Sequence, residues 1–82
     1  MGMMKRFYEA EKVSVLYYSS GHIRKVIFTN NHDGLYLTER ETRDGHGNVL
    51  ERYADDVRTI QGVERCCNAI CENQEVISIT IE

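Results

Sequence analysis

The sequence has no long apolar run, since no stretch approaches the roughly 18 to 20 residues that a membrane-spanning helix needs. It has no proline and no tryptophan, and its first residues after Met1 contain no hydrophobic segment followed by a cleavage site. We therefore expect neither export through a signal peptide nor a place in a membrane.

Cysteine is confined to one part of the chain. The three cysteines, Cys66, Cys67 and Cys71, are odd in number and lie in one short stretch. A disulfide framework in a small secreted domain is spread along the chain, so this placement argues against one. We expect reduced thiols and a cytoplasmic protein.

The length of 82 residues predicts a single domain over residues 1–82 and excludes enzymes that need two lobes. With 41 % hydrophobic and 28 % charged residues, the chain is typical of a folded protein rather than a disordered tail. The formal net charge is −3. Residues 1–30 carry five basic and two acidic groups, whereas residues 31–82 carry five basic and eleven acidic groups. This balance argues against nonspecific binding of nucleic acid by the whole surface, so we expect any such binding to be local.

Alternating apolar and polar residues, interrupted by turn residues about every ten positions, predict an antiparallel meander of about four strands. Small or turn-forming residues at 19–21, 30–34 and 44–48 would form the hairpin turns. The predicted strands cover residues 13–18, 22–29, 35–43 and 49–53.

After Tyr53 the spacing of apolar residues changes from two to about three and a half, which predicts a helix. Asp55 or Asp56 is the expected N-cap. Gly62 would weaken the helix interior, so the segment is either one kinked helix or a turn at 55–61 followed by a helix at 63–73. Alternatively, residues 57–60 extend a barrel-like sheet. The predicted apolar stripe is Tyr53, Val57, Ile60, Val63, Cys67, Ile70 and Cys71.

The chain then closes with a predicted strand at 75–82, whose isoleucines, Ile77, Ile79 and Ile81, should face the core. Residues 1–11 fit either a flexible arm or an added edge strand. The predicted fold class is thus α+β: an antiparallel β-meander of about four strands, one helix (kinked or straight) packed on one face, and a final β-strand.

The sequence contains no motif specific for catalysis, a cofactor or a metal. No CxxC pair occurs, and His22, His32 and His46 all fall in or beside predicted turns. Cys67 and Cys71, four residues apart, should lie on the inner face of the helix with Cys66 at its flank. Gly45-His46-Gly47 precedes a strand rather than a helix, so it does not resemble a phosphate loop. We assign no catalytic, cofactor-binding or metal-ligating residues.

A candidate binding surface combines cationic and aromatic side chains on the predicted sheet, where rings could stack on bases and guanidinium groups could meet phosphates. Alternation places Arg24 opposite Lys25, and Arg40 opposite Arg43, so these residues cannot all share one face. Cross-strand pairing of arginines with Glu39, Glu41 or Glu51 is the ordinary alternative. The candidate residues are Arg24, Lys25, Tyr36, Arg40, Arg43 and Arg52.

These features favour a non-enzymatic protein-binding module, a regulator or inhibitor of a larger partner. In size and mild acidity the chain resembles small phage-encoded inhibitors, anti-CRISPR proteins among them, although no motif extends this resemblance. The alternative is a sheet-faced nucleic-acid-binding module, and the third choice is a small metal-binding protein. We also expect a homodimer formed through an edge strand, either 76–81 or 13–18.

Overall fold

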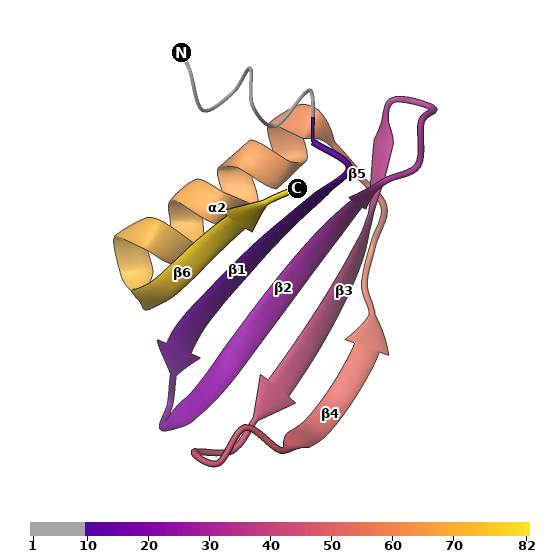
Figure 1. Ribbon diagram of the computed structural model, residues 1–82. Coiled ribbons are helices and arrows are strands. Elements are labelled where there is room, and N and C mark those ends of the chain that lie inside the picture. The colour runs from indigo at the N-terminus through magenta and orange to yellow at the C-terminus, as the bar shows by residue number, and fades with distance from the viewer. Residues whose placement is uncertain (1–9) are drawn as a thin grey trace.

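A computed structural model describes residues 10–82. Within these residues six strands form one antiparallel sheet, and one helix lies across it (Figure 1). The strand order is β4-β3-β2-β1-β6, with the short β5 pairing with β3. This confirms the predicted α+β fold class. The elements are β1 (Lys12–Ser19), β2 (His22–Asn30), β3 (Leu35–Arg43), β4 (Val49–Ala54), β5 (Arg58–Thr59), α2 (Ile60–Asn73) and β6 (Glu75–Ile81). Of the arm or edge strand predicted at 1–11, residues 1–9 lie outside the described residues.

The predicted hairpin turns lie where the small and polar residues indicated. Ser20 and Gly21 connect β1 to β2 with positive φ values of 52° and 78°, as a two-residue type I′ turn requires. Between β3 and β4, one Asp44 carboxylate oxygen accepts hydrogen bonds from the amides of His46 and Asn48, at 2.8 and 3.0 Å. These local bonds hold neighbouring strands in register.

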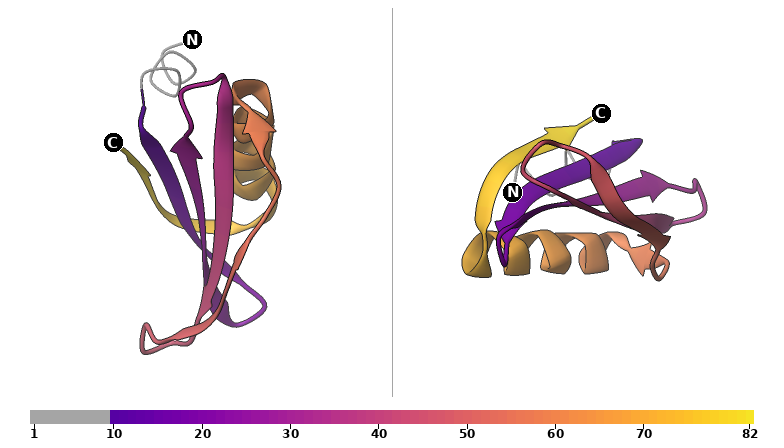
Figure 2. Two further views of the ribbon diagram at one scale, coloured as in Figure 1. Left: turned by 90° about the vertical axis from the view of Figure 1, so that its right-hand side faces the viewer. Right: turned by 90° about the horizontal axis from the view of Figure 1, so that it is seen from below.

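The sheet has a helix face and an open face. We call the side that carries Val15, Val26 and Phe28 the helix face, because these residues pack with the apolar stripe of α2 in one buried cluster. Opposite it lies the open face, which carries Ser14 and Lys25 and which no other described element covers (Figure 2). The buried stripe of α2 is Ile60, Val63, Cys67 and Ile70.

Helix α2 begins later than the predicted apolar stripe. Thr59 is the N-cap, and its hydroxyl accepts a hydrogen bond from the amide of Gly62 at 3.1 Å. The prediction of Asp55 or Asp56 as the cap was therefore wrong. So was the inclusion of Tyr53 and Val57, which are 45 % and 50 % exposed. Because Gly62 lies in the first turn rather than the interior, α2 is a single helix over Ile60–Asn73.

The residues before the helix continue the sheet, as the barrel-like alternative partly anticipated. Arg58 and Thr59 form β5, which pairs with Tyr36 and Leu35 of β3. Although Val57 matches a helical spacing, this short pairing holds the chain extended up to the helix cap. Pairing with an existing strand therefore overrides the local pattern here.

Strand β6 places most, but not all, of its predicted isoleucines against the core. Ile79 and Ile81 pack against the buried cluster together with Val76. The register with β1 shifts so that Ser78 pairs with Leu16 and Val76 pairs with Tyr17. This bulge leaves Ile77 outward and 41 % exposed, which corrects the prediction for that residue.

The outer strands of the sheet are β4 and β6, because β1 lies between β2 and β6. The prediction that residues 13–18 form an edge was therefore wrong, whereas residues 76–81 do lie at an edge. Within the described residues no helix is long and apolar enough to cross a membrane.

Candidate functional site

The structure divides the six candidate surface residues between the two faces. Lys25, Arg43 and Arg52 lie on the open face, since Lys25 and Arg52 both pair with Glu41 across the strands. Arg24, Tyr36 and Arg40 lie on the helix face. Tyr36 is only 3 % exposed and belongs to the core.

The aromatic rings needed for base stacking are largely absent from the open face. Tyr17, Phe28 and Tyr36 are all buried in the cluster beneath α2. Of the aromatic residues in the described strands, Tyr18 is the one that alternation places on the open face, where it is 47 % exposed. Cations and rings therefore do not interleave here as a base-stacking platform requires.

A buried carboxylate organises the cations of the open face. The Glu41 side chain is 1 % exposed although no helix covers it. One of its oxygens accepts hydrogen bonds from Nε and Nη2 of Arg43, at 3.0 and 2.8 Å. The other accepts from Nε of Arg52 at 2.9 Å and also pairs with Nη2 of that residue. Each arginine thus contacts one carboxylate oxygen through two of its nitrogens, and such charge-assisted hydrogen bonds are stronger than neutral ones.

The charge state of Glu41 follows from these contacts. Burial alone would raise the pKa of its carboxyl group, but the hydrogen bonds from Arg52 and Arg43 outweigh burial and hold the pKa below its ordinary value of 4.5. Glu41 is therefore ionised at neutral pH. The hydrogen bonds to Glu41 hold the side chains of Arg43 and Arg52 in fixed positions.

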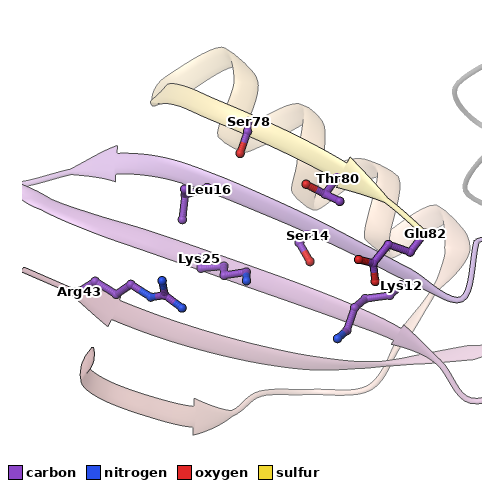
Figure 3. A pocket seen from close by; sticks show the side chains of 8 residues that line it. All are labelled: Lys12, Ser14, Leu16, Lys25, Arg43, Ser78, Thr80 and Glu82. Atoms are coloured by element: carbon purple, nitrogen blue, oxygen red, sulfur yellow. The ribbon is translucent and has the colours of Figure 1, made fainter. Parts of the chain in front are cut away.

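Beside this cluster the open face contains a hollow of about 280 Å³ (Figure 3). Its wall is formed by β6, and its floor by β1, β2 and the end of β3. Lys25 and Arg43 extend along the floor, and Ser78 and Thr80 project from β6 on the same side. The lining residues are Lys12, Ser14, Leu16, Lys25, Arg43, Ser78, Thr80 and Glu82.

On the helix face, Arg40 serves a structural ion pair. Its Nε donates to a carboxylate oxygen of Asp55 at 2.7 Å, and Arg58 approaches the same oxygen at 3.5 Å. The hydrogen bond from Arg40 and a second from the backbone amide of Asp56 lower the pKa of Asp55. Asp55 thus anchors the link between β4 and β5 instead of capping the helix.

The cysteines do not converge on a site. Cys67 is buried, Cys66 is half-buried beside Arg40, and Cys71 is exposed, which corrects its predicted place on the inner helix face. Burial raises the pKa of the Cys67 thiol to about 12. Across residues 10–82, no group of three or more histidine, cysteine or acidic side chains is placed to hold a metal ion.

Strand β4 is the most exposed element of the sheet. All six of its residues are exposed, and β3 is its only partner strand among residues 10–82. Val49, Leu50 and Tyr53 are 50 %, 56 % and 45 % exposed. Helix α2 does not extend over β4, as the end-on view in Figure 2 shows. This strand therefore offers both an unpaired backbone edge and apolar side chains.

The sequence indicated Glu41 only as one of three possible partners of the arginines, and it did not indicate the edge of β4. Alternation places Glu41 and Arg43 on one face of β3, and the pairing of glutamates with arginines was anticipated in general terms. The particular partner, Arg52, depends on the register between β3 and β4, which shifts at Thr42 and Arg43. Pairing the residues of β3 and β4 outward from the turn at 44–48 would match Glu41 with Arg52 only if this bulge were known.

Comparison of the chain with protein-family models, with curated proteins and with solved structures found no match.

Proposed function

We propose that this protein is a non-enzymatic protein-binding module that adds a strand of its partner to the free edge of β4. The observation that carries the proposal is that every residue of β4 is exposed while its outer edge has no strand beside it in residues 10–82. Unpaired backbone amides and carbonyls along such an edge bind an extended segment of another chain.

The side chains of β4 indicate what the partner segment must contain. Leu50 and Tyr53 present apolar surface. Glu51 lies between Leu50 and Arg52, and the Arg52 side chain is already paired with Glu41. Successive side chains of a partner strand would point to opposite faces of the sheet. Apolar residues at alternate positions of that strand would therefore cover either Leu50 or Tyr53. We therefore propose an extended, partly apolar peptide segment as the ligand. Such binding would suit a regulator or inhibitor of a larger protein.

The free thiols agree with a reducing compartment, and cytoplasmic location is part of this proposal. The nucleic-acid alternative receives less support, because the rings of Tyr17, Phe28 and Tyr36 are buried away from the cations of the open face. Homodimerisation is also a proposal. Strands β4 and β6 are the edges through which copies could pair, and light scattering at micromolar concentration tests it.

A comparison of edge variants tests the β4 proposal. Tyr53→Lys and Leu50→Lys place charge on exposed β4 positions, while Ile77→Lys places the same charge on the opposite edge, at a residue that is 41 % exposed. We expect capture of a partner from lysate of the native cells to fall about tenfold or more with either β4 variant. Capture by Ile77→Lys should match that of the unmodified protein.

Photo-crosslinking then locates the contact directly. A benzophenone side chain at position 53 should crosslink to the captured partner, whereas one at position 77 should not. Equal capture by all three lysine variants, or crosslinking from position 77 alone, would reject β4 as the binding edge.

A further inference from the structure

We propose that the hollow on the open face binds the phosphate group of a small phosphomonoester. The site is separate from the β4 edge, because its lining residues come from β1, β2, β3 and β6 and from Glu82, with none from β4. The inference therefore does not rest on the proposed function.

Two ammonium groups of the hollow form no salt bridge in the described part of the chain, although Lys25 is the cross-strand neighbour of Glu41. Neither Lys12 nor Lys25 takes part in an ion pair within residues 10–82. Lys25 is half-buried, so its charge is more weakly screened than that of a fully exposed lysine. An anion in the hollow would supply the missing partner.

The guanidinium of Arg43 adds a fixed donor. Its Nε and Nη2 bind Glu41, at 3.0 and 2.8 Å, and no interaction within the described chain engages Nη1. Because Glu41 holds the group rigidly, binding an anion through Nη1 costs little additional side-chain entropy. This arrangement resembles a preorganised anion donor rather than a loose surface arginine.

Hydroxyl groups complete the set of donors. Ser14 on β1 and Ser78 and Thr80 on β6 line the same hollow as Lys25 (Figure 3). Ser14 pairs with Thr80, and Leu16 with Ser78, so neighbouring strands place these hydroxyls side by side. A tetrahedral phosphate has several acceptor oxygens, which suits donors that converge from different strands.

Charge and size define the class of ligand. The residues that line the hollow include three cations, Lys12, Lys25 and Arg43, and one carboxylate, that of Glu82, although the whole chain carries −3. The volume of about 280 Å³ is at the small end for ligand pockets. A phosphate with a short organic group fits this space, and Leu16 provides an apolar contact for that group.

An NMR titration with glycerol 3-phosphate, inorganic phosphate and glycerol tests the proposal. We expect saturable shifts of the Ser14, Lys25 and Thr80 amides with both phosphates and none with glycerol. Lys25→Gln should weaken binding about tenfold, since one charge-assisted contact is lost. Arg24→Gln is the matched control, because Arg24 is the adjacent cation on the opposite face and should leave the affinity unchanged.

Thermal melts of Lys25→Gln and Arg24→Gln establish that both variants remain folded. Ser78→Ala is a second variant of the hollow, and it removes a hydroxyl donor at an exposed position. Absence of saturable shifts in the unmodified protein would overturn the proposal, as would equal weakening by Lys25→Gln and Arg24→Gln. A ten-nucleotide thymidine strand serves as the other source of phosphate. If it binds the hollow much more tightly than glycerol 3-phosphate, the small-molecule assignment is wrong.

Discussion

The helix-covered core and the uncovered region, comprising the open face and β4, achieve burial in different ways. Beneath α2, Phe28, Val26 and Val63 are completely buried by contact with other apolar groups. On the open face the completely buried group is a carboxylate, Glu41, enclosed by two arginines. One region is held by apolar packing, and the other combines this charge pairing with the buried side chain of Ile27.

This difference separates stability from binding. Apolar burial supplies most of the driving force for folding, so the core beneath α2 should determine whether the chain folds. The hollow and the β4 edge of the uncovered region are accessible because no helix of the described residues packs there. Substitutions at the exposed β4 edge should therefore have little effect on the fold.

The largest expected effect is in the core. Phe28→Ala should lower the free energy of unfolding by about 3 to 5 kcal/mol, because it leaves a cavity at a fully buried position. Leu37→Ala is the control on the uncovered side, at a residue 45 % exposed, and should change it by less than about 0.5 kcal/mol. Urea denaturation measures both. Similar losses in the two variants would remove the distinction between the regions.

The next effect tests the charge pairing. Glu41→Gln removes the charge that binds Arg43 and Arg52 and should cost about 1 to 3 kcal/mol at neutral pH. Glu39→Gln, on the same strand and face but exposed, should cost less than about 0.5 kcal/mol. Chemical denaturation of the two variants at pH 7 makes the comparison.

The pH dependence of Glu41 sharpens the same test. Because the folded-state pKa lies below the ordinary value of 4.5, the unfolded chain binds more protons between the two values. The stability that Glu41 contributes is thus present above pH 4.5 and is lost as the pH falls through the depressed pKa. The difference between the unmodified protein and Glu41→Gln should shrink on acidification. A difference that stays constant down to pH 2 would contradict the assigned charge state.

A smaller effect is expected at the start of α2. Thr59→Ala removes the oxygen that accepts from Gly62 and should cost about 1 kcal/mol. Gly62→Ala should instead stabilise the protein by up to about 1 kcal/mol, because a β-carbon there meets Arg58 only at an ordinary contact distance of 3.4 Å. Thermal melts decide both signs. Stabilisation by Thr59→Ala would show that the helix begins elsewhere.

The last prediction requires no substitution and concerns the reactivity of the cysteine thiols. With the protein folded at pH 8, a thiol reagent should modify Cys71 rapidly, because that residue is exposed, and should spare Cys67. Burial raises the pKa of Cys67 to about 12, so little reactive thiolate forms. Mass spectrometry of the labelled peptides identifies the sites. Faster labelling of Cys67 than of Cys71 would mean that α2 presents the other side to the sheet.

Much of the fold was predictable because it depends on local chemistry. Ser20-Gly21 and Asp44 to Asn48 form turns through their own backbone freedom and side-chain acceptors, so sequence alone indicates the hairpins. The inward positions of Ile60 and Cys67 also followed from helical spacing. Both were predicted, and both residues are buried.

The remaining features depend on contacts distant in sequence. The stripe through Tyr53 and Val57 has helical spacing, yet pairing of β4 and β5 with β3 keeps this stretch extended. The bulge that turns Ile77 outward arises from its register with β1. The partners of Glu41 likewise depend on the register of β4. No local pattern specifies these registers, which is why the sequence indicated glutamates as partners of the arginines without identifying which glutamate binds which arginine.

The proposed function depends most on β4 as the edge that receives a partner strand. Hydrogen exchange of the complex with the captured partner tests this directly, because a new strand would protect backbone amides that are free in the isolated protein. We predict slowed exchange along Val49–Ala54 and unchanged exchange along Glu75–Ile81. Protection confined to Glu75–Ile81, with β4 exchanging as before, would contradict it.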